Sequence, residues 1–256
     1  MNDPKQLPPP DGSPDDPALP LTAHLIELRR RLIVVFAALL VVFGFTLSFS
    51  AELMEFIKKP VLKYVDKLSF DTLSDPFFAQ VTLAFYAALF LTFPVVIWQA
   101  WLFLRPALYK KERRAVWPFL LFSYPLFVGG GVFVYMVVFP FGFDYFMNFD
   151  PTLVPSLRIG DYMANTVQFM FMFGLVFELP LVALLLTRMG LITHTFLNRN
   201  RRYAIVIIFV VAAILTPPDV ISQLLMAIPL LVLYEVSVVV SWLARTPPTE
   251  TRLENK

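Results

Sequence analysis

Residues 81–104 read VTLAFYAALFLTFPVVIWQAWLFL, and this stretch contains no charged side chain. A helix needs about 20 apolar residues to cross a hydrocarbon core of about 30 Å, so the stretch is long enough to span a bilayer. Of the 256 residues 58% are hydrophobic and 16% are charged, whereas a soluble domain is close to half apolar and a quarter charged. The sequence therefore predicts an all-α integral membrane protein.

Six apolar stretches in all predict six transmembrane helices, at roughly residues 32–49, 81–104, 116–141, 163–187, 203–216 and 221–242. The fifth would extend for only about 21 Å as a helix, and the sixth offers a similar uninterrupted length before Glu235. Both are predicted to be short. Prolines inside the stretches should bend the helices, which favours a curved wall over a straight bundle. They are Pro94, Pro118, Pro125, Pro180 and Pro229.

The ends of the chain differ in composition from the membrane domain, which we place at residues 21–243. Residues 1–20 contain seven prolines among Asp and Gly, with almost nothing apolar to bury, which predicts a disordered cytoplasmic tail. No basic start leads into an apolar run there, so the segment is not expected to be a cleaved signal. Residues 244–256 are expected to form a second cytoplasmic tail.

Basic residues are distributed unevenly between the two sets of loops. Five of the 21 fall on one side, namely Lys58, Lys59, Lys63, Lys67 and Arg158, and the other sixteen fall on the opposite side with both ends of the chain. The positive-inside rule predicts that both termini are cytoplasmic. In the outer loop at residues 50–80, acids and lysines alternate at helical spacings, which predicts a short amphipathic helix at the outer surface.

The sequence lacks the residues and motifs that several classes of enzyme chemistry and ligand binding require. The chain has no cysteine, and its two histidines, His24 and His194, lie far apart, so we expect neither redox nor zinc chemistry. No phosphate-binding loop, dinucleotide fingerprint, HExxH or GxSxG pattern is present, so no cofactor is predicted. A net charge of +2 is too small to suggest a nucleic-acid partner.

Two acids lie among bases at the cytoplasmic boundary. Glu27 belongs to HLIELRRRL at residues 24–32, and Glu112 belongs to RPALYKKERR at residues 105–114. In one interpretation both are local ion-pair partners, with Glu27 and Arg31 forming an i,i+4 pair worth a few tenths of a kcal/mol. In the other, the carboxylates are held at the cytoplasmic face to receive a cationic ligand.

Two further acids stand out, one of them inside an apolar stretch. Glu178 lies about 15 Å along the helix from Arg188, near the middle of the bilayer, where an acid is by default a functional hypothesis. The alternative is a protonated side chain bonded to a carbonyl freed by Pro180, or to Gln168 or Thr187. Asp219 follows two prolines, and its simplest role is to cap the sixth helix.

The polar segments together resemble the TatC family, the six-span receptor subunit of the twin-arginine protein translocase. The matching patterns are HLxELRxRL at 24–32, PFF at 76–78, FP at 93–94, WQxWxFxxPxLYxxERR at 98–114, FExP at 177–180 and LTPPDxxSQ at 215–223. They occur in order and with matching spacing from about residue 21 to residue 243.

This resemblance implies a concave bundle of six helices in the bacterial inner membrane, with no enzyme activity. Such receptors bind the twin-arginine signal peptides of folded proteins and use the proton-motive force. They associate with small single-span subunits of the TatA and TatB type, and with further copies of themselves.

The resemblance also carries roles over to individual residues. Glu27, Arg29, Phe103 and Glu112 match positions that read the arginine pair. Glu178 matches a residue of the membrane cup, where we expect it to bind a partner helix, and Pro60 and Asp219 match positions at the outer face.

The chemistry of Glu27 and Glu112 agrees with a site that binds a pair of arginines. Each guanidinium is planar and can be bound by both oxygens of one carboxylate. The alternative function is a proton-coupled small-solute transporter with Glu178 as the relay and Glu27 as an inner gate. The chain shows no evident internal repeat, which counts against that function. An intramembrane protease would need a nucleophile and base pair that the sequence lacks.

Overall fold

The computed structural model describes residues 21–104, 116–149, 155–215 and 219–244, and within these ranges the secondary structure is helical apart from one isolated bridge. The first half contains α1 (Leu21–Ser48), α2 (Ser50–Lys58), a 3-10 turn η1 (Val61–Lys63), α3 (Asp75–Leu104) and α4 (Val116–Phe133). The second half contains a π-helical turn η4 (Val134–Val138), α5 (Phe139–Met147), α6 (Ile159–Phe177), α7 (Leu179–Arg188), α8 (His194–Arg199), α9 (Arg201–Leu215) and α10 (Val220–Leu243).

Five helical segments of the described ranges are long and apolar enough to cross a membrane. They are Leu25–Ser48, Asp75–Phe103, Phe119–Met147, Ile159–Arg188 and Val220–Leu243, which confirms an all-helical membrane protein. The predicted fifth span coincides with α9, whose 15 residues reach only about 22 Å, so α9 is not one of these five. The third segment runs on to Met147, and the fourth already begins at Ile159.

Two of the five segments are interrupted. The third changes from α4 to the π-helical turn at Val134–Val138 before it continues as α5. The fourth breaks at Glu178, because Pro180 has no N–H to donate and its ring disturbs the preceding turn. By contrast, Pro94, Pro125 and Pro229 remain inside α3, α4 and α10.

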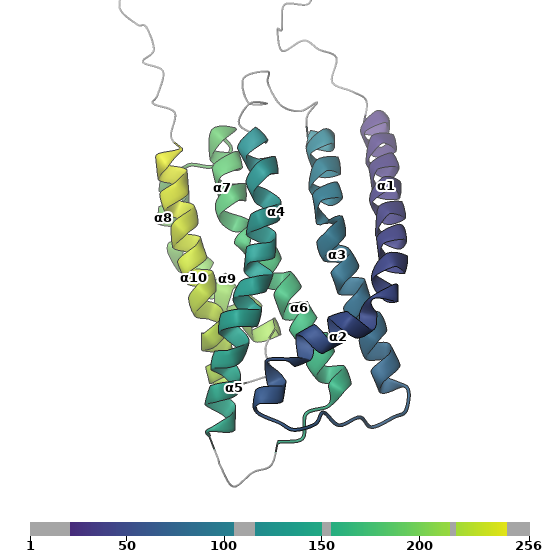
Figure 1. Cartoon of the computed structure of the whole chain (residues 1–256). Helices are drawn as coiled ribbons and strands as arrows, with labels where there is room; N and C mark the ends of the chain where they lie inside the picture. The colour runs from purple at the N-terminus through teal and green to yellow at the C-terminus, as the bar shows by residue number, and fades with distance from the viewer. Residues whose placement is uncertain (1–20, 105–115, 150–154, 216–218, 245–256) are drawn as a thin grey trace, which may run out of the picture.

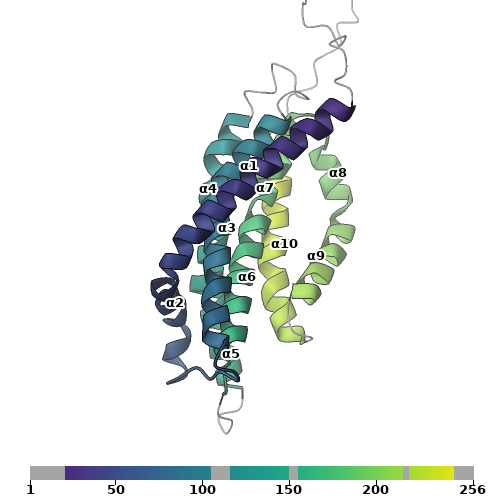
Figure 2. The same cartoon turned by 90° about the vertical axis from the view of Figure 1, so that its right-hand side faces the viewer.

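The long helices stand side by side, with α1 packed on α3, and α10 packed on α7 and α9 (Figure 1). Helix α1 begins and α10 finishes at the same end of the molecule, which we call the terminal end. At the other end, which we call the capped end, lie α2, η1 and the segments at residues 59–74 and 155–158. Figure 2 shows α1 crossing obliquely in front of the bundle towards α2, with α8 and α9 at the right-hand side of the view.

The capped end is held together by hydrogen bonds between segments far apart in the sequence. The hydroxyls of Tyr135 and Tyr162 donate to the carbonyls of Phe56 and Ile57 at 2.8 and 2.7 Å, so two carbonyls at the C-terminal end of α2 are satisfied. The backbone of Ser69 donates to Leu157 O at 2.9 Å and accepts from Ile159 N at 2.8 Å. The predicted amphipathic helix is confirmed as α2, which ends at Lys58, two residues before Pro60, and its place at the outer surface stays a prediction.

Helices α4 and α6 cross in backbone contact. A Cβ atom added at Gly130 would lie 2.5 Å from the carbonyl oxygen of Phe173, and one added at Gly174 would lie 2.7 Å from the ring of Phe127. Phe127 is fully buried and stacks on Phe93 of α3, with ring centroids 3.7 Å apart. Small residues are what allow membrane helices to approach this closely, since lipid supplies no hydrophobic force between them.

We predict that Gly130→Ala destabilises the protein by about 1–3 kcal/mol, because the added methyl group must push two backbones apart. Thermal unfolding of the purified chain in detergent should show a melting temperature several degrees below that of the parent. Gly129→Ala is the matched control on the same helix, since nothing lies within 4 Å of a Cβ atom there. Equal stability of the two variants would contradict the backbone contact.

Candidate functional site

A guanidinium joins α1 to α3 at the terminal end. The Arg31 Nη2 group donates to Glu27 Oε1 one turn earlier on α1 and to the carbonyl oxygen of Leu102 at 3.0 Å. Its Nη1 group donates to Gln99 Oε1 at 3.4 Å. The predicted ion pair between Glu27 and Arg31 is confirmed, and its two contacts with α3 were not predicted.

This bridge brings together two of the sequence segments that carry the resemblance. Glu27 lies in the first segment and Phe103 in the second, next to Leu102, whose carbonyl Arg31 holds. The Glu27 side chain is 28% exposed, and within the described residues its second carboxylate oxygen accepts no hydrogen bond. Arg29 is exposed on the same turn of α1, and Phe103 is half-buried. The arrangement offers a solvent-accessible acid beside an aromatic segment.

The second predicted acid of this site, Glu112, lies outside the described residues, as do the whole 105–114 segment and the tails at 1–20 and 245–256. The structure therefore leaves the pairing of Glu27 with Glu112 as a prediction.

Glu178 is buried between α4 and α6, with 6% of its surface exposed. The hydroxyl of Ser123 on α4 donates to Glu178 Oε1 at 2.8 Å. The other carboxyl oxygen, Oε2, is buried and has no hydrogen-bond partner in the described part of the chain. Burying a polar atom without a hydrogen-bond partner costs about 1–3 kcal/mol of stability. No hydrogen bond from the described residues offsets this cost for Oε2.

The partner of Glu178 differs from those considered from the sequence. Thr187 instead bonds the hydroxyl of Ser241 on α10 at 2.7 Å, and no hydrogen bond joins Gln168 to Glu178 among the described residues. Ser123 was missed because it lies 55 positions away in the chain on a different helix. Its one sequence signal was a hydroxyl residue two positions before Pro125 in an otherwise apolar stretch.

The two predicted outer-face residues both lie towards the capped end. Asp219 caps α10, since its Oδ1 accepts from the backbone of Ser222 at 2.7 Å, as predicted from the sequence. Pro60 separates α2 from η1 and is followed by the fully buried Val61. Nearby, Tyr64 donates to Asp144 at 2.6 Å, and this hydrogen bond raises the pKa of the Tyr64 hydroxyl.

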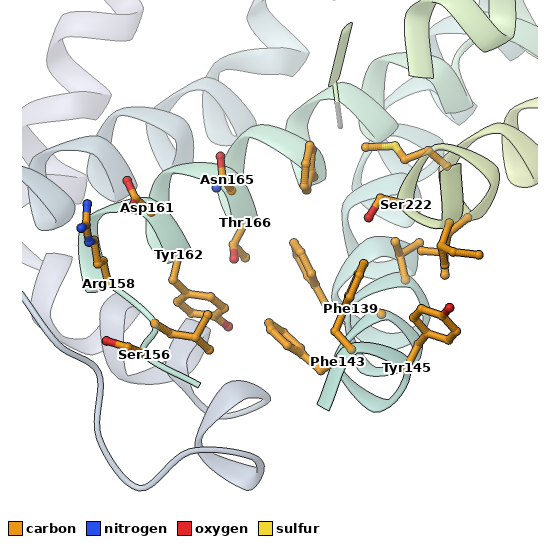
Figure 3. Close-up of a pocket in the computed structure, with 18 residues that line it drawn as sticks. Phe139, Phe143, Tyr145, Ser156, Arg158, Asp161, Tyr162, Asn165, Thr166 and Ser222 are labelled. Carbon is orange, nitrogen blue, oxygen red and sulfur yellow. The ribbon is translucent and has the colours of Figure 1, made fainter. Parts of the chain in front are cut away.

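A cavity of about 380 Å³ lies among α5, α6 and α10, towards the capped end (Figure 3). Phe139 and Phe143 of α5 face Tyr162 and Thr166 of α6 across it, and Ser222 of α10 lies at its edge. None of the predicted site residues lines this cavity. Within the described ranges, no three His, Asp or Glu side chains gather closely enough to hold a metal ion.

Comparison with known proteins yields one family. The family described as TatC, Sec-independent protein translocase protein, matches residues 23–229. The Sec-independent protein translocase protein TatC of Magnetococcus marinus is 40% identical over 225 residues, which cover 86% of this chain and 82% of that protein. The protein of the same name from Escherichia coli K12 is 40% identical over 223 residues, covering 86% of each chain.

Solved structures agree with this result. A crystal structure described as the twin arginine translocase receptor TatC superimposes with a TM-score of 0.76 at 37% sequence identity. The match covers 86% of this chain and 99% of that one. A second crystal structure of such a receptor, in the detergent DDM, gives a TM-score of 0.79 at 36% identity, covering 85% and 99% of the two chains.

The contact between Ser123 and Glu178 generates a prediction about stability. Ser123→Ala leaves a second buried carboxyl oxygen unpaired, so it should cost about 1–3 kcal/mol, measured by thermal unfolding in detergent. In a Glu178→Ala background the same change should cost much less, because the partner is gone. Purely additive effects of the two changes would show that the contact contributes nothing.

Proposed function

Because this chain belongs to the TatC family of Sec-independent protein translocase proteins, as the receptor subunit of the twin-arginine translocase, we propose that its terminal end binds the arginine pair of the signal peptides of folded proteins. As a TatC protein it is a multi-pass membrane protein and a non-enzymatic component of protein transport. Family membership also decides against the alternative of a proton-coupled solute transporter.

We propose Glu27, Arg29, Phe103 and Glu112 as the binding residues. One observation supports this proposal above the others: the Arg31 bridge holds the Glu27 segment of α1 against the Phe103 segment of α3. Among the described residues, one oxygen of the Glu27 carboxylate accepts no hydrogen bond. A guanidinium of the signal would engage the Glu27 carboxylate, and Glu112 would engage the second guanidinium from the neighbouring loop. The cationic side chain of Arg29 would disfavour poorly placed cations.

The wider arrangement follows from the same function. We propose six spans that form a concave wall, in which α9 crosses as the short fifth span and the bilayer thins around it. Support comes from the start of α9, where Arg201 binds Glu235 of α10 at 2.7 Å and so pairs the acid that interrupts the sixth span. We also propose membrane insertion of residues 21–243 in the bacterial inner membrane, with both tails in the cytoplasm and Pro60 and Asp219 at the outer face.

Glu178 is our proposed contact for a partner helix. A single-span subunit of the TatA or TatB type would offer a polar side chain to Glu178 Oε2, which lacks a partner in the described chain. Hydrogen bonds of this kind contribute roughly 0.6–2 kcal/mol between helices in a membrane. Several copies of this chain, each with its single-span partners, would form the receptor complex.

The orientation is tested by cysteine labelling, which is direct here because the chain has no native cysteine. Lys63→Cys should react with an impermeant thiol reagent added from outside the cell, and Asn200→Cys should react only after the membrane is opened, as the positive-inside rule predicts. The unsubstituted chain is the blank. Labelling of Asn200→Cys in intact cells would overturn the proposed orientation.

The proposed arginine-binding site at Glu27 and Glu112 is tested by measuring the affinity of the purified chain for a synthetic Arg-Arg signal peptide and for its Lys-Lys counterpart. Glu27→Gln and Glu112→Gln should each weaken binding of the Arg-Arg peptide by about tenfold or more, since each removes a charge-assisted hydrogen bond worth roughly 1.5–3 kcal/mol. If both acids hold one ligand, the double variant should depart from additivity.

The matched control for the arginine-binding site is Glu55→Gln, which removes one exposed carboxylate from α2 at the capped end. It should leave the affinity within about twofold of the parent, because charges beyond the Debye length of about 10 Å are screened at 0.1 M salt. Unchanged affinity in both Glu27→Gln and Glu112→Gln would place the arginine-binding site elsewhere on the molecule.

A further inference from the structure

The side chain of Arg31 lies in the interface between α1 and α3, at the proposed binding site. Its side chain is 19% exposed, and its guanidinium has three acceptors: Glu27 Oε1, Leu102 O at 3.0 Å and Gln99 Oε1 at 3.4 Å. The Nε atom is buried and has no hydrogen-bond partner among the described residues. Arg31 is thus held by several hydrogen bonds, but one of its N–H groups is unpaired within the described chain. A small movement of the guanidinium therefore exchanges hydrogen bonds at little cost in free energy.

The contact between Arg31 and Glu27 has the same chemistry that the proposed function assigns to the signal peptide. In both cases a guanidinium donates to the Glu27 carboxylate. Arg31 already donates to one oxygen of the Glu27 carboxylate, so an incoming arginine gains the full two-oxygen contact only if Arg31 releases that oxygen. The receptor without its ligand therefore has an internal arginine where the proposed function places an arginine of the signal.

We propose that Arg31 is a built-in competitor for the signal peptide, which occupies Glu27 in the empty receptor and returns to it as the signal leaves. The inference rests on the proposed function of Glu27 as a binding residue. By competing at Glu27, Arg31 weakens every cationic ligand there. Only a ligand that gains further contacts, such as a second guanidinium at another acid, then binds strongly.

The two acceptors on α3 make this exchange feasible. When a ligand takes Glu27, Arg31 keeps Leu102 O and Gln99 Oε1, so its charge is not left buried without a partner. The interface between α1 and α3 stays bridged through the same side chain. When the ligand loosens, Arg31 is one helical turn away from Glu27 and recaptures the carboxylate without diffusion. The competitor should therefore act mainly on the rate at which the signal peptide dissociates.

The test compares Arg31→Gln with the parent chain, using the purified full chain and the Arg-Arg peptide. Glutamine keeps an N–H donor for Leu102 O but removes the charge. Competition predicts tighter binding, by about tenfold, expressed chiefly as slower dissociation. A damaged site cannot produce tighter binding, so this outcome would distinguish competition from a structural role. Weaker or unchanged binding would overturn the proposal.

Arg30→Gln is the matched control, since it removes the same charge from an adjacent and exposed position on α1. It should change the affinity by less than about threefold, and a gain equal to that of Arg31→Gln would reduce the effect to general electrostatics and overturn the proposal. In a Glu27→Gln background, Arg31→Gln should give no gain, because no carboxylate remains to compete for. A full gain there would equally overturn it.

Two further comparisons keep the outcomes separate. If Arg31→Gln does not fold, Arg31→Lys preserves the charge and the apolar stem but lacks the planar fork, and it should bind the peptide more tightly than the parent. Unchanged affinity in that variant would overturn the competitor. If Glu27→Gln alone binds as tightly as the parent, the proposed role of Glu27 fails. If Glu27→Gln weakens binding while Arg31→Gln gives no gain, only the competitor fails.

Discussion

The close crossing of α4 and α6 determines where the polar groups of the bundle meet. Gly130 and Gly174 bring the two backbones together, and the ring of Phe127 fills the space beside Gly174. Ser123 lies one turn before Phe127 on α4, and Glu178 lies one turn after Gly174, at the junction of α6 and α7, so two antiparallel helices in this alignment place the hydroxyl opposite the carboxyl. A shift of one residue along either helix would leave the carboxyl in an apolar interface, where an unpaired polar group is costly.

The two ends of the molecule are stabilised in different ways. At the capped end, tyrosine hydroxyls and backbone groups satisfy one another across α2, η4, α6 and the segment around Ser69. These uncharged hydrogen bonds are joined there by the contact of Tyr64 with Asp144 and by an exposed ion pair between Arg158 and Asp71. At the terminal end, α1 and α3 are joined through one arginine side chain with a charged partner. Contacts between long charged side chains rearrange more readily than backbone pairs do, so the terminal end is the better place for a reversible ligand.

The sequence predicted what depends on neighbouring residues. The pair between Glu27 and Arg31 and the cap by Asp219 join positions within a few residues of each other, and both are confirmed. Of the six predicted spans, the described residues contain five segments long and apolar enough to cross a membrane, and a crossing by α9 stays a prediction. The partner of Glu178 and the contacts of Arg31 with α3 were not predicted, because apolar periodicity does not specify which helices adjoin. Pro180 was expected to bend its helix, and the segment does break there, at Glu178. The π-helical turn at Val134–Val138 was not predicted, because no residue pattern in that apolar stretch indicated it.

The π-helical turn at Val134–Val138 also determines which face α5 presents. A π turn accommodates one residue more than an α turn, and each residue of an α-helix advances the side-chain direction by about 100°. Every side chain after Val138 is therefore rotated away from the face it would share with α4 in an unbroken helix. Phe139 and Phe143 line the cavity opposite Tyr162, so the wall that α5 contributes to this cavity depends on a single-residue offset within one transmembrane segment.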